Sequence, residues 1–99
     1  MKEPGFPADA PTARGGNGAA AAGRQVVVIG GERPGGTIAP VEAFDPRSGT
    51  WRALPPSPRP RHGAAVAGIG RTAYQALGGP EPGLTVSSTL MALRVPPLD

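Results

Sequence analysis

A short motif that occurs twice at a fixed spacing constrains the fold of this chain more than any other feature. Val27-Val28-Ile29-Gly30-Gly31 is followed 48 positions later by Gln75-Ala76-Leu77-Gly78-Gly79. Two flanking pairs recur as well, Gly23-Arg24 as Gly70-Arg71 and Arg14-Gly15 as Arg61-His62-Gly63. A period of this size is typical of repeat proteins, in which each repeat is one supersecondary unit. We therefore expect two similar units that follow each other along the chain.

The composition limits how much each unit can bury. The 99 residues include 16 glycines and 14 prolines. Only 38% of the residues are hydrophobic, and 4% are aromatic. Such a Gly and Pro content lies at the border of disordered sequences. We therefore expect the units to depend on neighbouring units for a stable core, as repeats generally do.

The first unit predicts three strands between residues 24 and 60. Gln25 to Ile29 is a β-branched run ended by a glycine pair, and its continuous apolar character predicts a strand covered on both faces. Val41 to Phe44 and Trp51 to Leu54 flank Asp45-Pro46-Arg47-Ser48-Gly49. Asp suits the first position of a tight turn, Pro fixes φ at the next, and Gly permits a left-handed exit. The two runs therefore predict a hairpin.

The second unit, residues 61–95, repeats this order without its last strand. We expect strands at 63–67, 73–77 and 88–95, but nothing after them corresponds to the Asp-Pro turn or to Trp51. Residues 55–60 hold four prolines, which cannot donate to a ladder and indicate a connector. We expect residues 1–23 to form a flexible leader, in which residues 14–23 are a decayed copy of residues 61–70. Residues 96–99 are expected to form a short tail.

The order of these signals resembles the Kelch repeat, which also occurs in galactose-oxidase-like β-propellers. The resemblance rests on Gly30, Gly31, Phe44, Asp45, Gly49, Trp51, Arg61, His62, Tyr74, Gly78 and Gly79. It implies that each repeat forms a four-stranded blade and that several blades surround a central channel. The fold class that follows is all-β, a partial Kelch-type β-propeller with fewer than two complete blades and a disordered N-terminal leader.

The chain departs from the family pattern in two ways. A closed ring needs at least four blades, whereas this sequence supplies less than two, so we expect either part of a longer propeller or a chain that pairs with another. The segment before Gln25 is also rich in Ala and Gly and poor in strand propensity. We therefore expect only three good strands in the first blade.

Each family position has a structural explanation. The glycine pairs permit positive φ and close approach between blades. We expect Trp51 to be a buried wedge between blade faces. His62 is the only histidine, and we expect it to be a hydrogen-bonded residue at a strand entry rather than a metal ligand.

The sequence favours a binding function without catalysis. We expect a protein- or ligand-binding module whose loops at 32–40 and 80–86 face a partner, or a chain that associates with itself to complete a propeller. The resemblance also leaves an alternative, a piece of a propeller oxidase or sialate epimerase whose reactive groups lie outside this chain. Oxidase chemistry of that family needs two tyrosines, two histidines and a cysteine, and this chain has one, one and none. We expect no catalytic residue, cofactor or metal.

The charge pattern gives no sign of a nucleic-acid partner. The net charge is +3, but nine of the ten basic residues are arginines scattered along the chain, at 14, 24, 33, 47, 52, 59, 61, 71 and 94. No apolar run approaches the length of a membrane helix or of a signal peptide. We therefore expect no membrane association and, by default, a cytoplasmic location.

Overall fold

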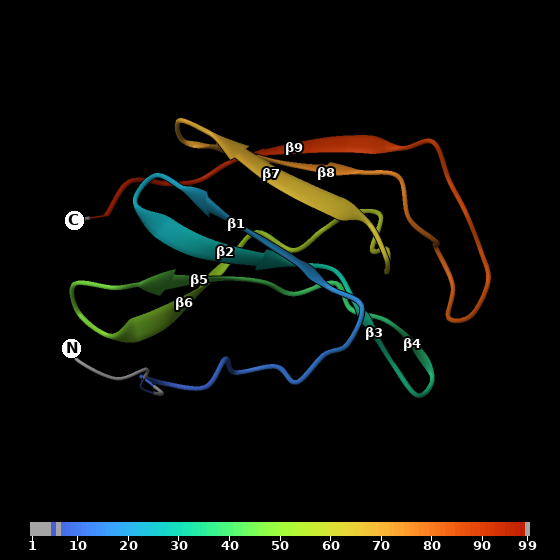
Figure 1. Cartoon of the computed structure of the whole chain (residues 1–99), viewed down its shortest axis with the longest axis horizontal. Coiled ribbons are helices and arrows are strands. Elements are labelled where there is room, and N and C mark those ends of the chain that lie inside the picture. The colour runs from blue at the N-terminus through green and yellow to red at the C-terminus, as the bar shows by residue number, and fades with distance from the viewer. Residues whose placement is uncertain (1–4, 6, 99) are drawn as a thin grey trace.

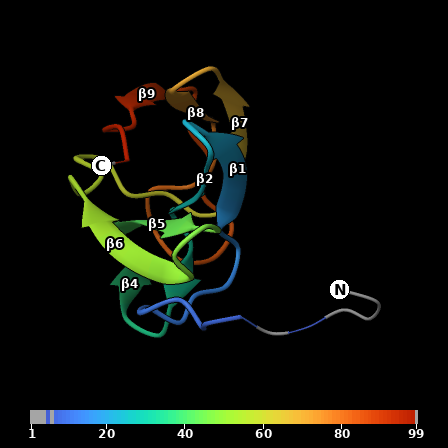
Figure 2. The same ribbon diagram turned by 90° about the vertical axis from the view of Figure 1, so that its left-hand side faces the viewer.

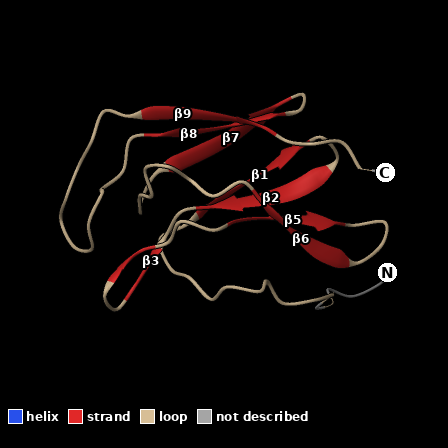
Figure 3. Ribbon diagram, turned by 180° about the vertical axis from the view of Figure 1, so that it is seen from behind, coloured by secondary structure: helices blue, strands red, loops and turns tan. Residues whose placement is uncertain are grey.

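A computed structural model describes residues 5 and 7–98, and within them the chain is built from antiparallel strands with no helix (Figures 1 and 3). The all-β prediction is therefore confirmed. The nine strands are β1 (Gly18–Ala22), β2 (Gln25–Ile29), β3 (Glu32–Arg33), β4 (Gly36–Thr37), β5 (Val41–Asp45), β6 (Thr50–Leu54), β7 (Ala65–Ile69), β8 (Thr72–Ala76) and β9 (Leu90–Arg94).

The first repeat forms a complete four-stranded sheet in the order β1-β2-β5-β6. The predicted hairpin is present: the N–H of Gly49 donates to the carbonyl of Asp45 over 2.8 Å, and Gly49 has a φ of 73°. Strand β5 pairs with β6 from Val41↔Leu54 to Asp45↔Thr50. The order of turn residues in this segment was thus sufficient to predict its conformation.

The prediction of a leader through residue 23 is wrong, because β1 lies within it. Strand β1 pairs with β2 along its whole length, from Gly18↔Ile29 to Ala22↔Gln25. Gly23 and Arg24 close the two-residue turn with φ values of 57° and 62°, the left-handed pair that matches strand twist in hairpins. Pairing with a strongly β-prone neighbour therefore overrides the low strand propensity of alanine.

The expectation that both faces of β2 are covered is only partly correct. Val27 and Ile29 are fully buried, and Val28 is nearly so. Val26, however, is 39% exposed. Because neighbouring residues of a strand alternate between faces, Val26 and its cross-strand partner Phe44 lie on the face opposite to the core residues Val27 and Ile29.

The second repeat forms a three-stranded sheet in the order β7-β8-β9. Its strands lie within two residues of the predicted bounds, and among the residues described no fourth strand pairs with β9. Among the described residues β9 therefore lacks the outer partner that β6 provides for β5, as the missing Asp-Pro turn predicted.

The two repeats are related by 47 positions rather than by the 48 that separate their glycine pairs. Strands β1 and β2 correspond at this spacing to β7 and β8, and the isolated bridge Gly15↔Glu32 corresponds to His62↔Gly79. Gly78 therefore occupies the place of Gly31. Leu77 occupies the place of Gly30 and adopts its left-handed conformation, with a φ of 67°.

The sheets pack face to face and diverge from β1 and β7 toward β6 and β9 (Figure 2). A Cβ atom on Gly18 would lie 2.8 Å from Cβ of Val66, so the absence of a side chain permits the close approach of β1 and β7. The buried core between the sheets contains Ala22, Val27, Ile29, Val41, Ala43, Leu54, Ala73 and Val95. Two sheets that fan out from adjacent inner strands have the arrangement of neighbouring propeller blades.

The segment after β9 fills the open side of this wedge. Val95 is fully buried, and its N–H donates to the carbonyl of Arg71 over 2.7 Å. Gln25 donates to the carbonyl of Pro96 over 3.1 Å, and the guanidinium of Arg52 donates to the carbonyls of Pro96 and Pro97. Residues 95–97 are therefore part of the fold, while Asp99 of the predicted tail lies outside the described residues.

Candidate functional site

The loops predicted to face a partner lie at one end of the two sheets. The β3–β4 hairpin rises from the first sheet, and residues 77–89 connect β8 to β9 beside it (Figure 1). The hydroxyl of Thr37 donates to the carbonyl of Pro80 over 3.3 Å, and the N–H of Gly83 donates to Glu32 Oε2 over 3.3 Å. These contacts join the two loops into one surface, which we call the loop rim.

Two large apolar side chains project from the loop rim. Leu84 is fully exposed and Val86 is 88% exposed. The base of the same loop is held in place, because Thr85 Oγ1 donates to the carbonyl of Glu81 over 2.7 Å and the N–H of Leu77 donates to the carbonyl of Thr89 over 2.7 Å. The loop rim therefore presents apolar groups on a hydrogen-bonded frame.

His62 lies beneath the loop rim at the entry to the second sheet. Its Nε2 lies 2.7 Å from the carbonyl oxygen of Glu81, and its Nδ1 lies 3.7 Å from Glu32 Oε1. Its backbone N–H donates to the carbonyl of Gly79 over 3.0 Å. Within the described residues, no group of three or more His, Cys, Asp or Glu side chains has the geometry to hold a metal ion.

The glycine pairs lie where the two repeats meet. Gly30 and Gly31 have φ values of 76° and 107°, and a Cβ atom on Gly30 would lie 2.6 Å from Nε2 of Gln75. The N–H of Gly31 donates to the carbonyl of Arg61 over 2.9 Å, which links the repeats through their backbones. In the second pair, a Cβ atom on Gly78 would lie 2.6 Å from the carbonyl oxygen of His62.

Arg61 is buried between the sheets, with 1% of its surface exposed. Its two terminal nitrogens donate to the carbonyls of Leu77, Thr89 and Gln75 and to Gln75 Oε1, over 2.7 to 3.3 Å. Burial, together with the charge of Arg59, lowers the pKa of the Arg61 guanidinium, which still remains protonated. In the part of the chain that the structure describes, no carboxylate forms an ion pair with it.

Arg14 occupies the equivalent place in the first repeat but has a carboxylate partner. It donates to the carbonyls of Gly30 and Pro40 over 2.9 Å each and forms a buried 2.8 Å ion pair with Glu42. Sequence reasoning identified Arg61 but missed its counterpart Arg14, as well as Glu42, which pairs with Arg14, and Gln75, which accepts from Arg61. The recurrence of Arg-Gly at 14–15 was the available signal, and it was assigned to a decayed copy.

The turn and aromatic positions lie far from the loop rim. Asp45 Oδ1 accepts the N–H of Arg47 over 2.9 Å, which is the main reason why the pKa of Asp45 is lowered. Phe44 and Trp51 pack with their ring centroids 5.2 Å apart. Tyr74 is half-buried on β8.

The prediction that Trp51 is a buried wedge is wrong for the described structure. Trp51 is half-buried, and its Nε1 donates to the carbonyl of Ala8 over 3.0 Å. It pairs with Phe44 on the face of the first sheet that turns away from the second repeat. Among the residues that the structure describes, the segment before β1 contacts this face, through Ala8 at Trp51 and Thr12 at Glu42, whereas a wedge needs a blade on each side.

The match to known families follows this architecture. Residues 13–58 match the model of the Kelch motif. They contain Arg14, all four strands of the first sheet and the Asp-Pro hairpin. This segment is a Kelch repeat. The match begins twelve residues before Gln25 and five before the start of β1, in agreement with the four-stranded first sheet.

The chain is therefore a partial Kelch-type propeller with one four-stranded blade and one three-stranded blade. The second blade lies outside the matched residues, but it repeats the strands, the buried arginine and the bridge of the first at a spacing of 47 residues. No curated protein matches the chain. Among the residues described, no helix is long and apolar enough to cross a membrane.

Proposed function

We propose that this Kelch chain is a binding module that contacts a protein partner through the loop rim and carries out no catalysis of its own. The single observation that carries the proposal is the exposure of the apolar side chains of Leu84 and Val86 on that rim. Exposed apolar side chains that gather at one place are typical of interaction surfaces. Loops held on a rigid sheet scaffold are also the usual place for recognition residues.

The frame beneath these side chains favours binding because it limits the entropy lost on association. Thr37 and Glu32 from the first blade hold the loop of the second blade through Pro80 and Gly83. A loop that is already ordered loses less conformational freedom when a partner binds. The contacts between blades therefore support recognition at the loop rim rather than on either blade alone.

Site-specific photo-cross-linking tests this proposal. A photoreactive phenylalanine analogue at position 84 is compared in cell extract with the same group at Ile69, which is 70% exposed and lies at the opposite end of its sheet. We expect a discrete protein adduct from position 84 that Val86→Ser reduces at least fivefold. Equal adducts from both positions, or none from position 84, would contradict the proposal.

A second candidate is self-association that extends the array of blades. The outer face of the first blade carries Val26 and the Phe44–Trp51 pair, and the outer face of the second exposes Ile69 and Leu90. Since the two faces differ, copies would join head to tail, which forms closed rings when the rotation permits. We expect Val26→Glu to reduce the sedimentation coefficient of such an assembly, with Val86→Glu as the control.

The alternative of a propeller enzyme stays a prediction. In that case the reactive groups would come from residues outside this chain. Extension of the reading frame upstream would distinguish the two readings, since further repeats with a tyrosine, histidine and cysteine set favour an enzyme.

A further inference from the structure

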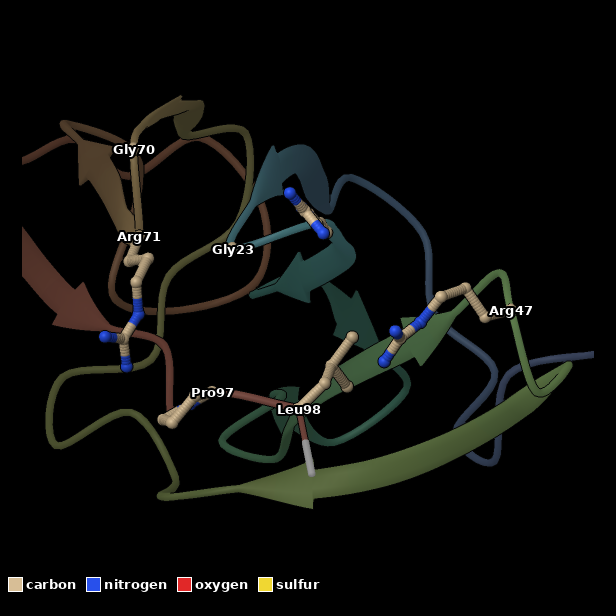
Figure 4. A pocket seen from close by; sticks show the side chains of 7 residues that line it. Gly23, Arg47, Gly70, Arg71, Pro97 and Leu98 are labelled. Atoms are coloured by element: carbon tan, nitrogen blue, oxygen red, sulfur yellow. The ribbon is translucent and has the colours of Figure 1, made fainter.

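A hollow of about 430 Å³ opens at the end of the blades opposite the loop rim (Figure 4). Three hairpin turns and the segment after β9 surround it: the β1–β2 turn, the β5–β6 turn and the β7–β8 turn. Arg47 and Arg71 extend toward it from different blades, and Leu98 lies between them (Figure 4). The lining residues are Gly23, Arg24, Arg47, Gly70, Arg71, Pro97 and Leu98.

The repeat itself places two of the three arginines. Arg24 and Arg71 each follow the turn glycine of their blade, Gly23 and Gly70, at the common spacing of 47 residues. The N–H of Gly23 donates to the carbonyl of Gly70 over 2.9 Å, so the two turns lie against each other. Stacking of the blades therefore brings two guanidinium groups to one hollow, although they are far apart in the sequence.

Among the described residues, the three lining arginines and Asp45, the partner of Arg47, together carry two positive charges. Arg47 Nε lies 3.7 Å from Asp45 Oδ1, and the lowered pKa of Asp45 keeps that carboxylate ionised at neutral pH. Within the described residues, no carboxylate forms an ion pair with Arg24 or Arg71. Arg71 is partly oriented, because Nη2 donates to the carbonyl of Val95 over 3.3 Å.

We propose that this hollow binds a small organic phosphate, a phosphate monoester attached to an apolar group. A phosphate monoester carries close to two negative charges at neutral pH, which matches Arg24 and Arg71, for which the described residues provide no ion-pair partner. The planar guanidinium group recognises phosphate oxygens through paired hydrogen bonds. Pro97 and Leu98 line the hollow beside the arginines with apolar surface. Inorganic phosphate would pair with the arginines but would leave this apolar surface without a contact.

Titration of the full chain with phenyl phosphate, followed by amide NMR, tests the proposal. We expect saturable shifts of the Gly23 and Gly70 amides, and at least fivefold weaker binding of inorganic phosphate and of phenol. Raising the salt from about 50 to 300 mM should weaken binding severalfold. Lack of saturable shifts at these two glycines would overturn the proposal.

Matched variants distinguish a built site from general attraction to a basic protein. Arg24→Asn removes one charge from the hollow and suits the left-handed position of residue 24. Arg33→Asn removes the same charge from β3 at the opposite end. We expect Arg24→Asn to weaken phenyl phosphate at least fivefold and Arg33→Asn less than twofold, with amide dispersion showing that both remain folded. Equal losses in the two variants would overturn the proposal.

Discussion

The packing of the two inner strands makes Gly68→Ala the most informative single substitution. Gly68 lies on β7 against β1, and a Cβ atom there would lie 2.8 Å from the carbonyl carbon of Ala21, with the carbonyl oxygen closer still. Ordinary contacts between carbon atoms are about 3.5 to 4.0 Å. Strands β1 and β7 would therefore have to separate by about 1 Å or more, because the Ala21 carbonyl belongs to the backbone and cannot rotate out of the way as a side chain can.

The expected loss follows from overpacking at a backbone contact. Such insertions cost about 1 to 3 kcal/mol, and we expect a value near 3 because the obstacle is a peptide group rather than a flexible side chain. For a chain of this size that corresponds to a decrease in Tm of about 10 to 20 °C. Thermal unfolding followed by far-ultraviolet circular dichroism gives the measurement.

Gly36→Ala is the matched control for Gly68→Ala. Gly36 lies on β4, a Cβ atom there would meet nothing within 4 Å, and its φ is not positive. We expect a change within about 1 kcal/mol, since the new methyl group mainly restricts the unfolded chain. If Gly68→Ala proved as mild as Gly36→Ala, β1 and β7 would not be packed against each other and the face-to-face arrangement would be refuted.

Three further predictions test the rest of the structure. Trp51→Ala should cost about 1 to 2 kcal/mol in chemical denaturation, below the 3 to 5 typical of buried aromatics, and a loss above 3 would place it in a closed interface. Gln75→Val should cost about 1 to 3 kcal/mol because it deprives Arg61 of an acceptor. Met91 pairs with Gln75 as Glu42 pairs with Val28, the residue equivalent to Gln75 in the first blade. Adding Met91→Glu should therefore restore most of the lost stability, and no rescue would refute the equivalence of Arg14 and Arg61. The pKa of Asp45 is lowered from its ordinary value of 3.8, so the carboxylate stabilises the fold fully well above that value and loses this effect as the pH falls through the lower folded pKa. The Tm difference between about pH 5 and pH 3 should therefore shrink in Asp45→Ala. An unchanged difference would show that the Arg47 N–H does not favour the ionised carboxylate.

Local signals predicted much of this fold because they act within a few residues. The hairpin at 45–49 depends on Asp, Pro and Gly at fixed turn positions, and the strand at 25–29 on a β-branched run. Strand β1 could not be predicted in the same way. Its alanines have little strand propensity, and what makes them a strand is pairing with β2.

The same contrast between local signals and contacts across strands applies to the site residues. The glycine pairs and Arg61 were identified from the repeated motif, but the register between repeats was misjudged by one residue because Leu77 adopts a conformation expected of glycine. The pairing of Glu42 with Arg14 and the contact of Gln75 with Arg61 depend on which residues face each other across strands. Such contacts follow from the packing of the sheets and leave no local signal.

The nuclear Overhauser effect between the Val66 methyl groups and the α-protons of Gly18 is the most direct measurement of the central claim that the two repeats stack as neighbouring blades. The close approach at Gly18 predicts a strong cross-peak, accompanied by the β1–β2 and β7–β8 cross-strand peaks of two separate sheets. Absence of the Val66–Gly18 peak in a chain that retains both sets of cross-strand peaks would contradict the stacked arrangement.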